Sequence, residues 1–253
     1  MSDEFESSQR ITFFESLPHA FAFPLQGSGK FVLILGTFLL WLGQALSMAP
    51  LVGFIIAITT AGYMAAFLFD IVVASADGDE EMPDLPEVGE FVSEILYPLF
   101  LLLSTIVCCL IPVIILSLAA PEAPTSARAA GYVIGALYAP MAILAVSIHR
   151  SLAALSPTVV VRWVLRVPTQ YAVACVFLGL TVAVHFAAMW IAEQIPIVSS
   201  LIATFLELYF LAVQMRVLGM ISYTNEEKLD WQYDSGAPEK LTTFFREDAR
   251  AWI

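Results

Sequence analysis

Long apolar runs constrain what this chain can fold into more than any other feature of its sequence. A helix that crosses the hydrocarbon core of a bilayer needs about 20 apolar residues, because each residue adds about 1.5 Å. Six runs meet this requirement, at residues 31–48, 51–69, 96–118, 129–148, 171–192 and 197–221. The sequence therefore predicts an all-α integral membrane protein with six transmembrane helices and short interfacial helices between them.

The composition supports this fold class. Of the 253 residues, 59% are hydrophobic and only 13% are charged, whereas about 25% of the residues of a soluble domain are charged. We divide the chain into a cytoplasmic or interfacial segment (1–30), a transmembrane domain (31–222) and a cytoplasmic tail (223–253). The tail can form an amphipathic helix over 242–253, which would dock on the cytoplasmic face or bind another chain.

Two spans carry features that predict their shape and packing. Pro112 lies inside the third span, where it removes a backbone hydrogen bond, so we expect a kink there. The fourth span carries Gly131, Gly135 and Ala139 on one face, which is the spacing of small residues that lets two helices approach closely. Only residues 193–196 separate the last two spans, which predicts a tight antiparallel hairpin.

The distribution of lysine and arginine predicts the orientation, because cytoplasmic loops retain these residues. With six spans, ten of the eleven basic residues fall on the side that holds both termini, and only Arg128 falls on the other side. Both termini are therefore predicted to be cytoplasmic, in a bacterial inner membrane. The N-terminus is acidic where a secretory signal is basic, so we expect the first span to remain in the mature protein.

The charge balance restricts the partners. The net charge is −12, which opposes binding to nucleic acid. The predicted partners are the lipid bilayer and other membrane or cytoplasmic proteins. No metal or cofactor is expected, because Cys108, Cys109 and Cys175 lie inside apolar runs. The acidic loop at 75–87 lacks the alternating aspartates of an EF-hand and is interpreted as a solvated loop, with a metal or partner site as the alternative.

A second polar segment lies on the same predicted side as the acidic loop. Arg162 and Arg166 lie one helical turn apart around Trp163 and form a cytoplasmic basic elbow. Opposite charges on one side of the membrane predict that the elbow attracts the acidic loop, with a small energy because both are exposed. Arginine and tryptophan also suit the headgroup layer.

Two ionisable residues lie deep within the predicted spans. A charge at bilayer depth is costly unless it is paired or hydrated, so such residues are functional candidates. If the last two spans fold back near residue 195, His185 and Glu207 are within about one helical turn of each other in depth. They are predicted to form an intramembrane polar pair, which would either fix the register of the hairpin or relay a proton or ion.

The order of several short motifs resembles a family of uncharacterised bacterial polytopic membrane proteins, a domain of unknown function. The motifs are Gly62-Tyr63-Met64, Met82-Pro83-Asp84-Leu85-Pro86, Glu94-Ile95-Leu96-Tyr97-Pro98, the elbow from Ser156-Pro157 through Arg162 and Arg166 to Pro168 and Tyr171, and the exit at Gly219, Tyr223, Leu229 and Trp231. Asp70 departs from the family pattern, which places basic residues there. The resemblance implies the architecture and no activity.

Catalytic motifs are absent from the sequence. It contains no His-Glu-x-x-His, Cys-x-x-Cys, Gly-x-Ser-x-Gly or dinucleotide-binding glycine pattern. We therefore expect no catalytic residues and no enzyme activity. The preferred interpretation is a non-catalytic structural, assembly or accessory subunit of a membrane complex. The alternative is a small transporter or channel that uses the polar residues of the last hairpin.

Overall fold

A computed structural model describes residues 13–49, 52–86, 89–192, 199–225 and 229. Six of its helices are long and apolar enough to span a membrane, so the protein is an all-α, multi-pass membrane protein as predicted. They are α3 (Gly29–Ser47), α4 (Gly53–Ala76), α5 (Tyr97–Ala119, preceded by the π-turn η3, Val92–Leu96), α6 (Thr125–His149), α8 (Pro168–Ala192) and α9 (Ser199–Thr224).

Short helical elements join or precede the spans. The chain enters through α2 (Phe13–Ser16), η1 (Pro18–Phe21) and η2 (Phe23–Leu25), and η4 (Leu152–Leu155) and α7 (Pro157–Arg166) connect α6 to α8. The predicted helix at 242–253 lies outside the described residues, as does the turn between α8 and α9. The structure does not test the predicted domain boundaries.

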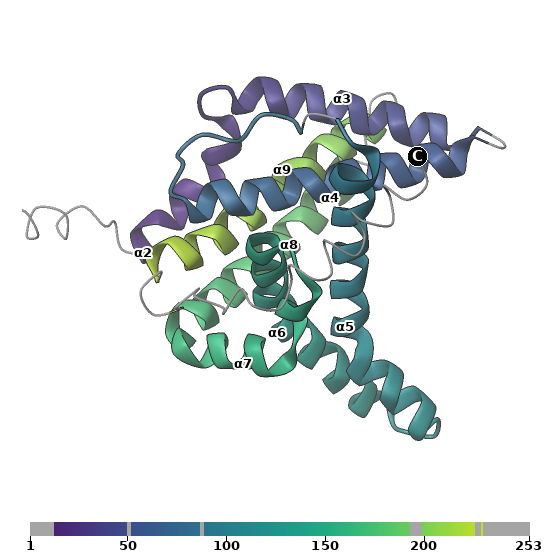
Figure 1. Ribbon diagram of the computed structural model, residues 1–253, viewed down its shortest axis with the longest axis vertical. Helices are drawn as coiled ribbons and strands as arrows, with labels where there is room; N and C mark the ends of the chain where they lie inside the picture. Colours follow the sequence, from purple (N-terminus) through teal and green to yellow (C-terminus); the bar gives the residue numbers. More distant parts are fainter. Residues whose placement is uncertain (1–12, 50–51, 87–88, 193–198, 226–228, 230–253) are drawn as a thin grey trace, which may run out of the picture.

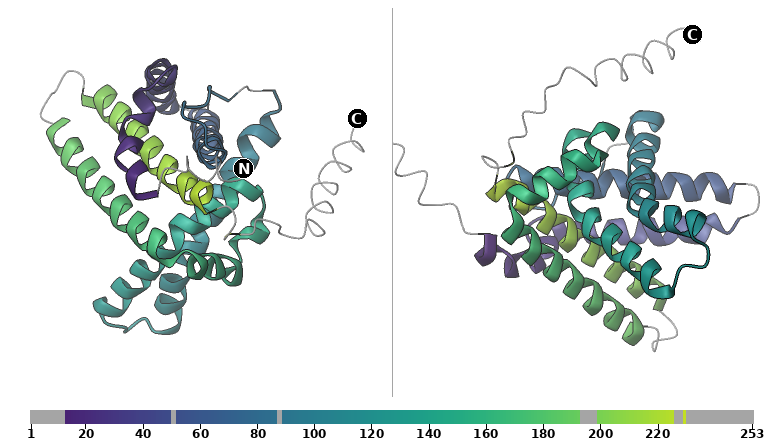
Figure 2. Two further views of the ribbon diagram at one scale, coloured as in Figure 1. Left: turned by 90° about the vertical axis from the view of Figure 1, so that its left-hand side faces the viewer. Right: turned by 90° about the horizontal axis from the view of Figure 1, so that it is seen from below.

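Successive spans form pairs that diverge from a shared region. Figure 1 shows α3 and α4 running side by side, while α5 crosses them at a steep angle. Figure 2 shows the α5–α6 pair projecting away from the rest of the molecule, with α8 and α9 along another side. The divergence concentrates helix contacts at one place, which we call the packed region.

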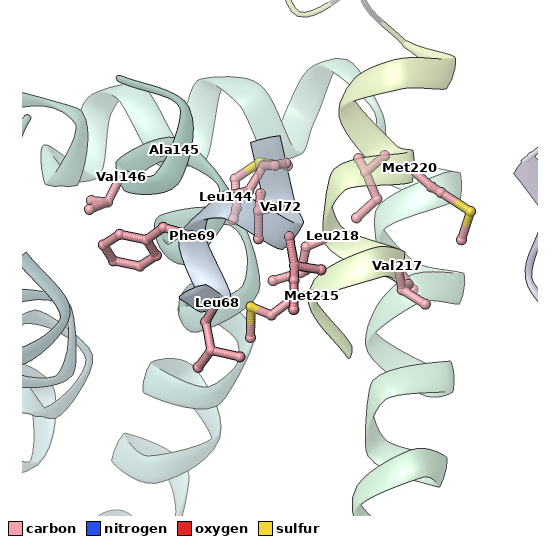
Figure 3. Packing of buried hydrophobic residues seen from close by; sticks show 14 of the residues in the cluster. Leu68, Phe69, Val72, Leu144, Ala145, Val146, Met215, Val217, Leu218 and Met220 are labelled. Atoms are coloured by element: carbon pink, nitrogen blue, oxygen red, sulfur yellow. The ribbon is translucent and has the colours of Figure 1, made fainter. Parts of the chain in front are cut away.

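The packed region forms where the C-terminal halves of α4, α6 and α9 meet. Figure 3 shows side chains of the three helices converging there. Residues in this region are almost fully buried, whereas the N-terminal halves of the same helices are mostly exposed or half-buried. The buried residues labelled in Figure 3 are Leu68, Phe69, Val72, Leu144, Ala145, Val146, Met215, Val217, Leu218 and Met220.

Glycines allow the closest helix approaches. At Gly219 of α9, an added Cβ would lie 2.3 Å from Ser75 Cβ and 2.6 Å from the Val72 carbonyl oxygen of α4. At Gly135 of α6, it would lie 2.1 Å from the Cys109 carbonyl oxygen of α5. The small residues of the fourth span therefore serve a contact within the chain, between the two helices of one hairpin.

The second span is longer than predicted. The sequence prediction ended it at residue 69 because Asp70 follows, but α4 continues to Ala76. Asp70 can remain in the helix because Arg150 pairs with it at 2.6 Å. The remaining ends agree with the predicted boundaries to within about four residues. Pro112 lies inside α5, which continues on both sides of it, and the expected kink stays a prediction.

The N-terminal segment packs against protein rather than lying only in the interface. Phe13, Leu17 and Phe23 are buried, and the Tyr209 hydroxyl of α9 donates a hydrogen bond to the Phe21 carbonyl at 2.8 Å. The Arg216 guanidinium lies 4.5 Å from the centre of the Phe23 ring. Aromatic residues of this segment therefore cover part of α9.

Candidate functional site

A polar groove lies between α3, α4 and α9, away from the packed region. Its volume is about 260 Å³. The groove forms near the C-terminal end of α3 and the N-terminal ends of α4 and α9. The residues that line it are Leu40, Gly43, Gln44, Ser47, Ala57, Thr60, Ala61, Met64, Thr204, Glu207 and Leu208.

Contacts between side chains of α3, α4 and α9 shape the groove. The Thr204 hydroxyl donates to the Ser200 carbonyl at 2.9 Å and lies 3.4 Å from Gln44 Oε1. At Gly43, an added Cβ would lie 2.4 Å from Thr60 Oγ1, so α3 and α4 approach closely here. A larger residue at position 43 would push the two helices apart and widen this end of the groove.

Among the described residues, Glu207 is the only ionisable one that lines the groove. It lies about 12 Å along the helix axis from Ser199, at about 1.5 Å per residue. It is exposed on the groove surface. An unpaired charge at the centre of a spanning helix costs about 2.5 to 3.5 kcal/mol. Within the described part of the chain, the lining includes an amide and several hydroxyls but no lysine, arginine or histidine. These groups can accept hydrogen bonds, and none of them carries a positive charge.

The predicted contact between His185 and Glu207 is not formed. The His185 ring packs edge-on against Phe186 of its own helix and Phe210 of α9, at centroid distances of 5.9 and 5.4 Å. Glu207 instead faces α3 and α4 across the groove. Similar depth was a valid inference, but depth leaves open which way each helix face turns. The closer packing of α9 against α4 turns Glu207 away from α8.

A second polar cluster joins three spans at the packed region. Arg150, which ends α6 in the left-handed conformation at φ 47°, pairs with Asp70 of α4 at 2.6 Å. Its carbonyl accepts a hydrogen bond from the Tyr97 hydroxyl at the start of α5. Its guanidinium lies 5.5 Å from the centre of the Phe69 ring. These contacts fix the relative positions of α4, α5 and α6, which is a structural role.

One described basic residue that contacts the acidic loop is Arg216, which the sequence prediction did not choose. Arg216 of α9 donates to the carbonyl of Asp79. Of the two predicted elbow residues, Arg162 is exposed on α7, and Arg166 donates to the Leu229 carbonyl at 2.9 Å. The expected attraction between loop and elbow therefore stays a prediction.

Trp163 is covered by protein and does not present its ring to lipid headgroups. Its side chain is 4% exposed, and its ring stacks on the ring of His149 at a centroid distance of 5.4 Å. The outward side of α7 is instead formed by Val161, Arg162 and Leu165, with Leu165 71% exposed. This mixed apolar and basic face still suits the interface between lipid and water.

The sequence analysis missed most of the groove. It selected Glu207 as a candidate but not Gln44, Thr60 or Thr204. One local signal was available, because Thr204 and Glu207 are three residues apart and so share a helix face. Nothing local shows that α3 supplies the opposite wall.

Comparisons with protein-family models, with curated proteins and with solved structures find no match to this chain. The function must therefore be argued from the chain itself, and the resemblance to an uncharacterised bacterial membrane-protein family stays a prediction.

Proposed function

We propose that the protein is a non-catalytic accessory or assembly subunit of a complex in the bacterial inner membrane. Its cytoplasmic side would hold a protein partner. The observation that supports this is a polar platform at the packed region, which we define as residues 77–86, α7 and the end of α9 together with Leu229. Exposed charged residues cover the platform, while its backbone is fixed by internal contacts.

The platform is built from segments that are distant in sequence. Gly78, at φ 88°, fits tightly under Tyr223, where an added Cβ would lie 2.5 Å from the ring. Met82 of the loop is 2% exposed. Together with the Arg216 contact to the Asp79 carbonyl and the Arg166 contact to the Leu229 carbonyl, these contacts order a charged surface. An ordered charged surface favours partner recognition, because little entropy is lost on binding.

The proposal can be tested by native electrophoresis of the full chain after extraction in a mild detergent. A complex larger than the chain and its detergent micelle, containing a second polypeptide, supports it. Reversing the exposed loop charges with Asp79→Lys and Glu80→Lys should dissociate this complex. Glu122→Lys, an exposed substitution in the turn between α5 and α6, is the matched control and should preserve it. A chain that remains alone, or only with copies of itself, would contradict the proposal.

The orientation has its own test. Single cysteines at Thr125 and Ser235, in a variant without the three native cysteines, should react with an impermeant thiol reagent from opposite sides of the membrane. The cysteine at 235 should react only after the cytoplasmic side is opened. Labelling of both from one side would overturn the six-span topology with cytoplasmic termini.

A small transporter or channel is the second candidate. The polar groove favours it, because Glu207, Gln44, Thr60 and Thr204 are placed together between three spans. The groove differs from the predicted path in the last hairpin, since it uses α9 but not α8. Substrate-dependent uptake into proteoliposomes that is lost in Glu207→Gln would support this candidate over the accessory role.

A further inference from the structure

We propose that the groove between α3, α4 and α9 binds a primary ammonium group, with Glu207 as its counter-ion. The proposal goes beyond the accessory role and does not depend on it. It begins from charge: among the described residues, the only ionisable side chain lining the groove is a carboxylate in a spanning helix, and none is cationic. A positive charge that enters the groove would be stabilised there.

The available acceptors match the donors of an ammonium group. A primary ammonium has three N–H donors and no acceptor. The Thr204 hydroxyl already donates to the Ser200 carbonyl. The remaining acceptors in the lining include the Glu207 carboxylate, Gln44 Oε1 and Thr60 Oγ1. The lining thus supplies an acceptor for each N–H, one of them charged and therefore strong.

The size and walls of the groove favour an organic ammonium over other cations. A bare metal ion would fill little of the 260 Å³ and would leave Leu40, Met64 and Leu208 without a contact. A whole helix, at about 10–12 Å in diameter, is too wide for this volume. A short alkylammonium places its charge at Glu207 and its carbon atoms against the apolar walls, as in small-molecule sites generally.

Two sources could supply this chemistry in a membrane. One is the headgroup of phosphatidylethanolamine, and the other is a free amine that enters from the aqueous phase. Both present the same primary ammonium, so the test first asks whether the group binds and then separates the sources.

The first experiment uses the full wild-type chain in phosphatidylglycerol nanodiscs. Dicyclohexylcarbodiimide modifies carboxyl groups in apolar surroundings, and peptide mass spectrometry would report the modified fraction of Glu207. Ethanolamine should slow the loss of the unmodified Glu207 peptide, with the acylurea and ethanolamide products counted together, at least about tenfold at saturation. Ethylene glycol, a neutral analogue, and NaCl at equal ionic strength should not. Equal protection by NaCl or ethylene glycol, or no protection by ethanolamine, would overturn the proposal.

The second experiment locates the site with neighbouring threonines. Thr60 lines the groove, whereas the Thr59 hydroxyl donates to the Ile55 carbonyl on its own helix. Thr60→Val should raise the ethanolamine concentration needed for half-protection by about tenfold or more, because one hydrogen bond to a charged donor is lost. Thr59→Val should leave it unchanged. Equal effects of the two variants would overturn the assignment of Thr60.

Nanodiscs that contain phosphatidylethanolamine separate the sources. Protection of Glu207 by this lipid without added amine supports the ammonium site and assigns it to a headgroup. Protection by ethanolamine alone supports the site and assigns it to a free amine. Both results are independent of the native electrophoresis that tests the accessory role. Failure of the ammonium site can therefore be distinguished from failure of the accessory role.

Discussion

The packed region and the α5–α6 hairpin are both apolar, but they differ in what covers their side chains. α5 is the most apolar of the six spans, yet a much smaller share of it is buried than of α4. Ile115 and Leu118 near the end of α5 are 59% and 80% exposed, while Ile71 and Val72 of α4 are fully buried. In this fold, a highly apolar span is one that faces lipid. High hydropathy therefore does not show which residues form the protein core.

The physical reason is that lipid tails solvate leucine as well as another helix does. Helices associate where small residues let them come close or where polar groups find partners. The packed region has both kinds of contact, with Gly219 against α4 and the Asp70–Arg150 pair. The outer part of the hairpin has close contacts at Gly131 and Gly135, and most of its large apolar side chains face outward.

The largest expected effect comes from Gly219→Val. The added side chain collides with the α4 backbone, and overpacking of this kind costs about 3 kcal/mol or more. The free energy of unfolding, measured by denaturation with sodium dodecyl sulfate in mixed micelles, should fall by about this amount. Gly179→Val is the matched control, because nothing lies within 4 Å of its added Cβ. Equal losses of unfolding free energy in the two variants would contradict the close packing of α9 on α4 at Gly219.

Breaking the ion pair should have the next largest effect. Asp70→Ala leaves the Arg150 guanidinium without its partner. The two side chains are 37% and 36% exposed, so the cost should be about 2 kcal/mol, below that of a fully buried pair. The same unfolding assay should show that Arg128→Ala, at an exposed position in the first turn of α6, costs less than about 0.5 kcal/mol. A larger loss of unfolding free energy in Arg128→Ala than in Asp70→Ala would contradict the difference between the packed region and the α5–α6 hairpin.

A smaller effect is expected at the N-terminal segment. Tyr209→Phe removes the hydrogen bond to the Phe21 carbonyl, which contributes about 0.5 to 1.5 kcal/mol. Limited proteolysis should cut the segment around residue 26 faster in this variant. Tyr132→Phe changes an exposed tyrosine of α6 and should leave the cleavage rate unchanged. Unaltered cleavage in Tyr209→Phe would show that this hydrogen bond does not hold the segment.

The smallest effect distinguishes two arginines. Arg216→Gln should expose the acidic loop to protease, because it weakens the contact with the Asp79 carbonyl. Arg162→Gln should have little effect, because Arg162 is exposed on α7. We expect a difference of about twofold to fivefold in cleavage rate, as for a contact below about 1 kcal/mol. Faster cleavage in Arg162→Gln alone would favour the elbow predicted from sequence.

The sequence by itself determined the class of the protein and the approximate extent of its spans. A spanning helix satisfies its own backbone hydrogen bonds and needs a fixed length of apolar residues, so each span can be recognised locally. It also identified Glu207 as a functional candidate. A charged side chain deep in a bilayer is costly whichever way its helix is rotated.

Only the tertiary structure decided what Glu207 faces. Its depth follows from counting residues, but the direction of its side chain depends on how α9 rotates against its neighbours, and α9 packs more closely on α4 than on α8. The same holds for Asp70, which a local rule treated as the end of a span until Arg150, eighty residues away, kept it inside α4. Contacts between distant segments are set by close packing of surfaces, and no single segment contains that information.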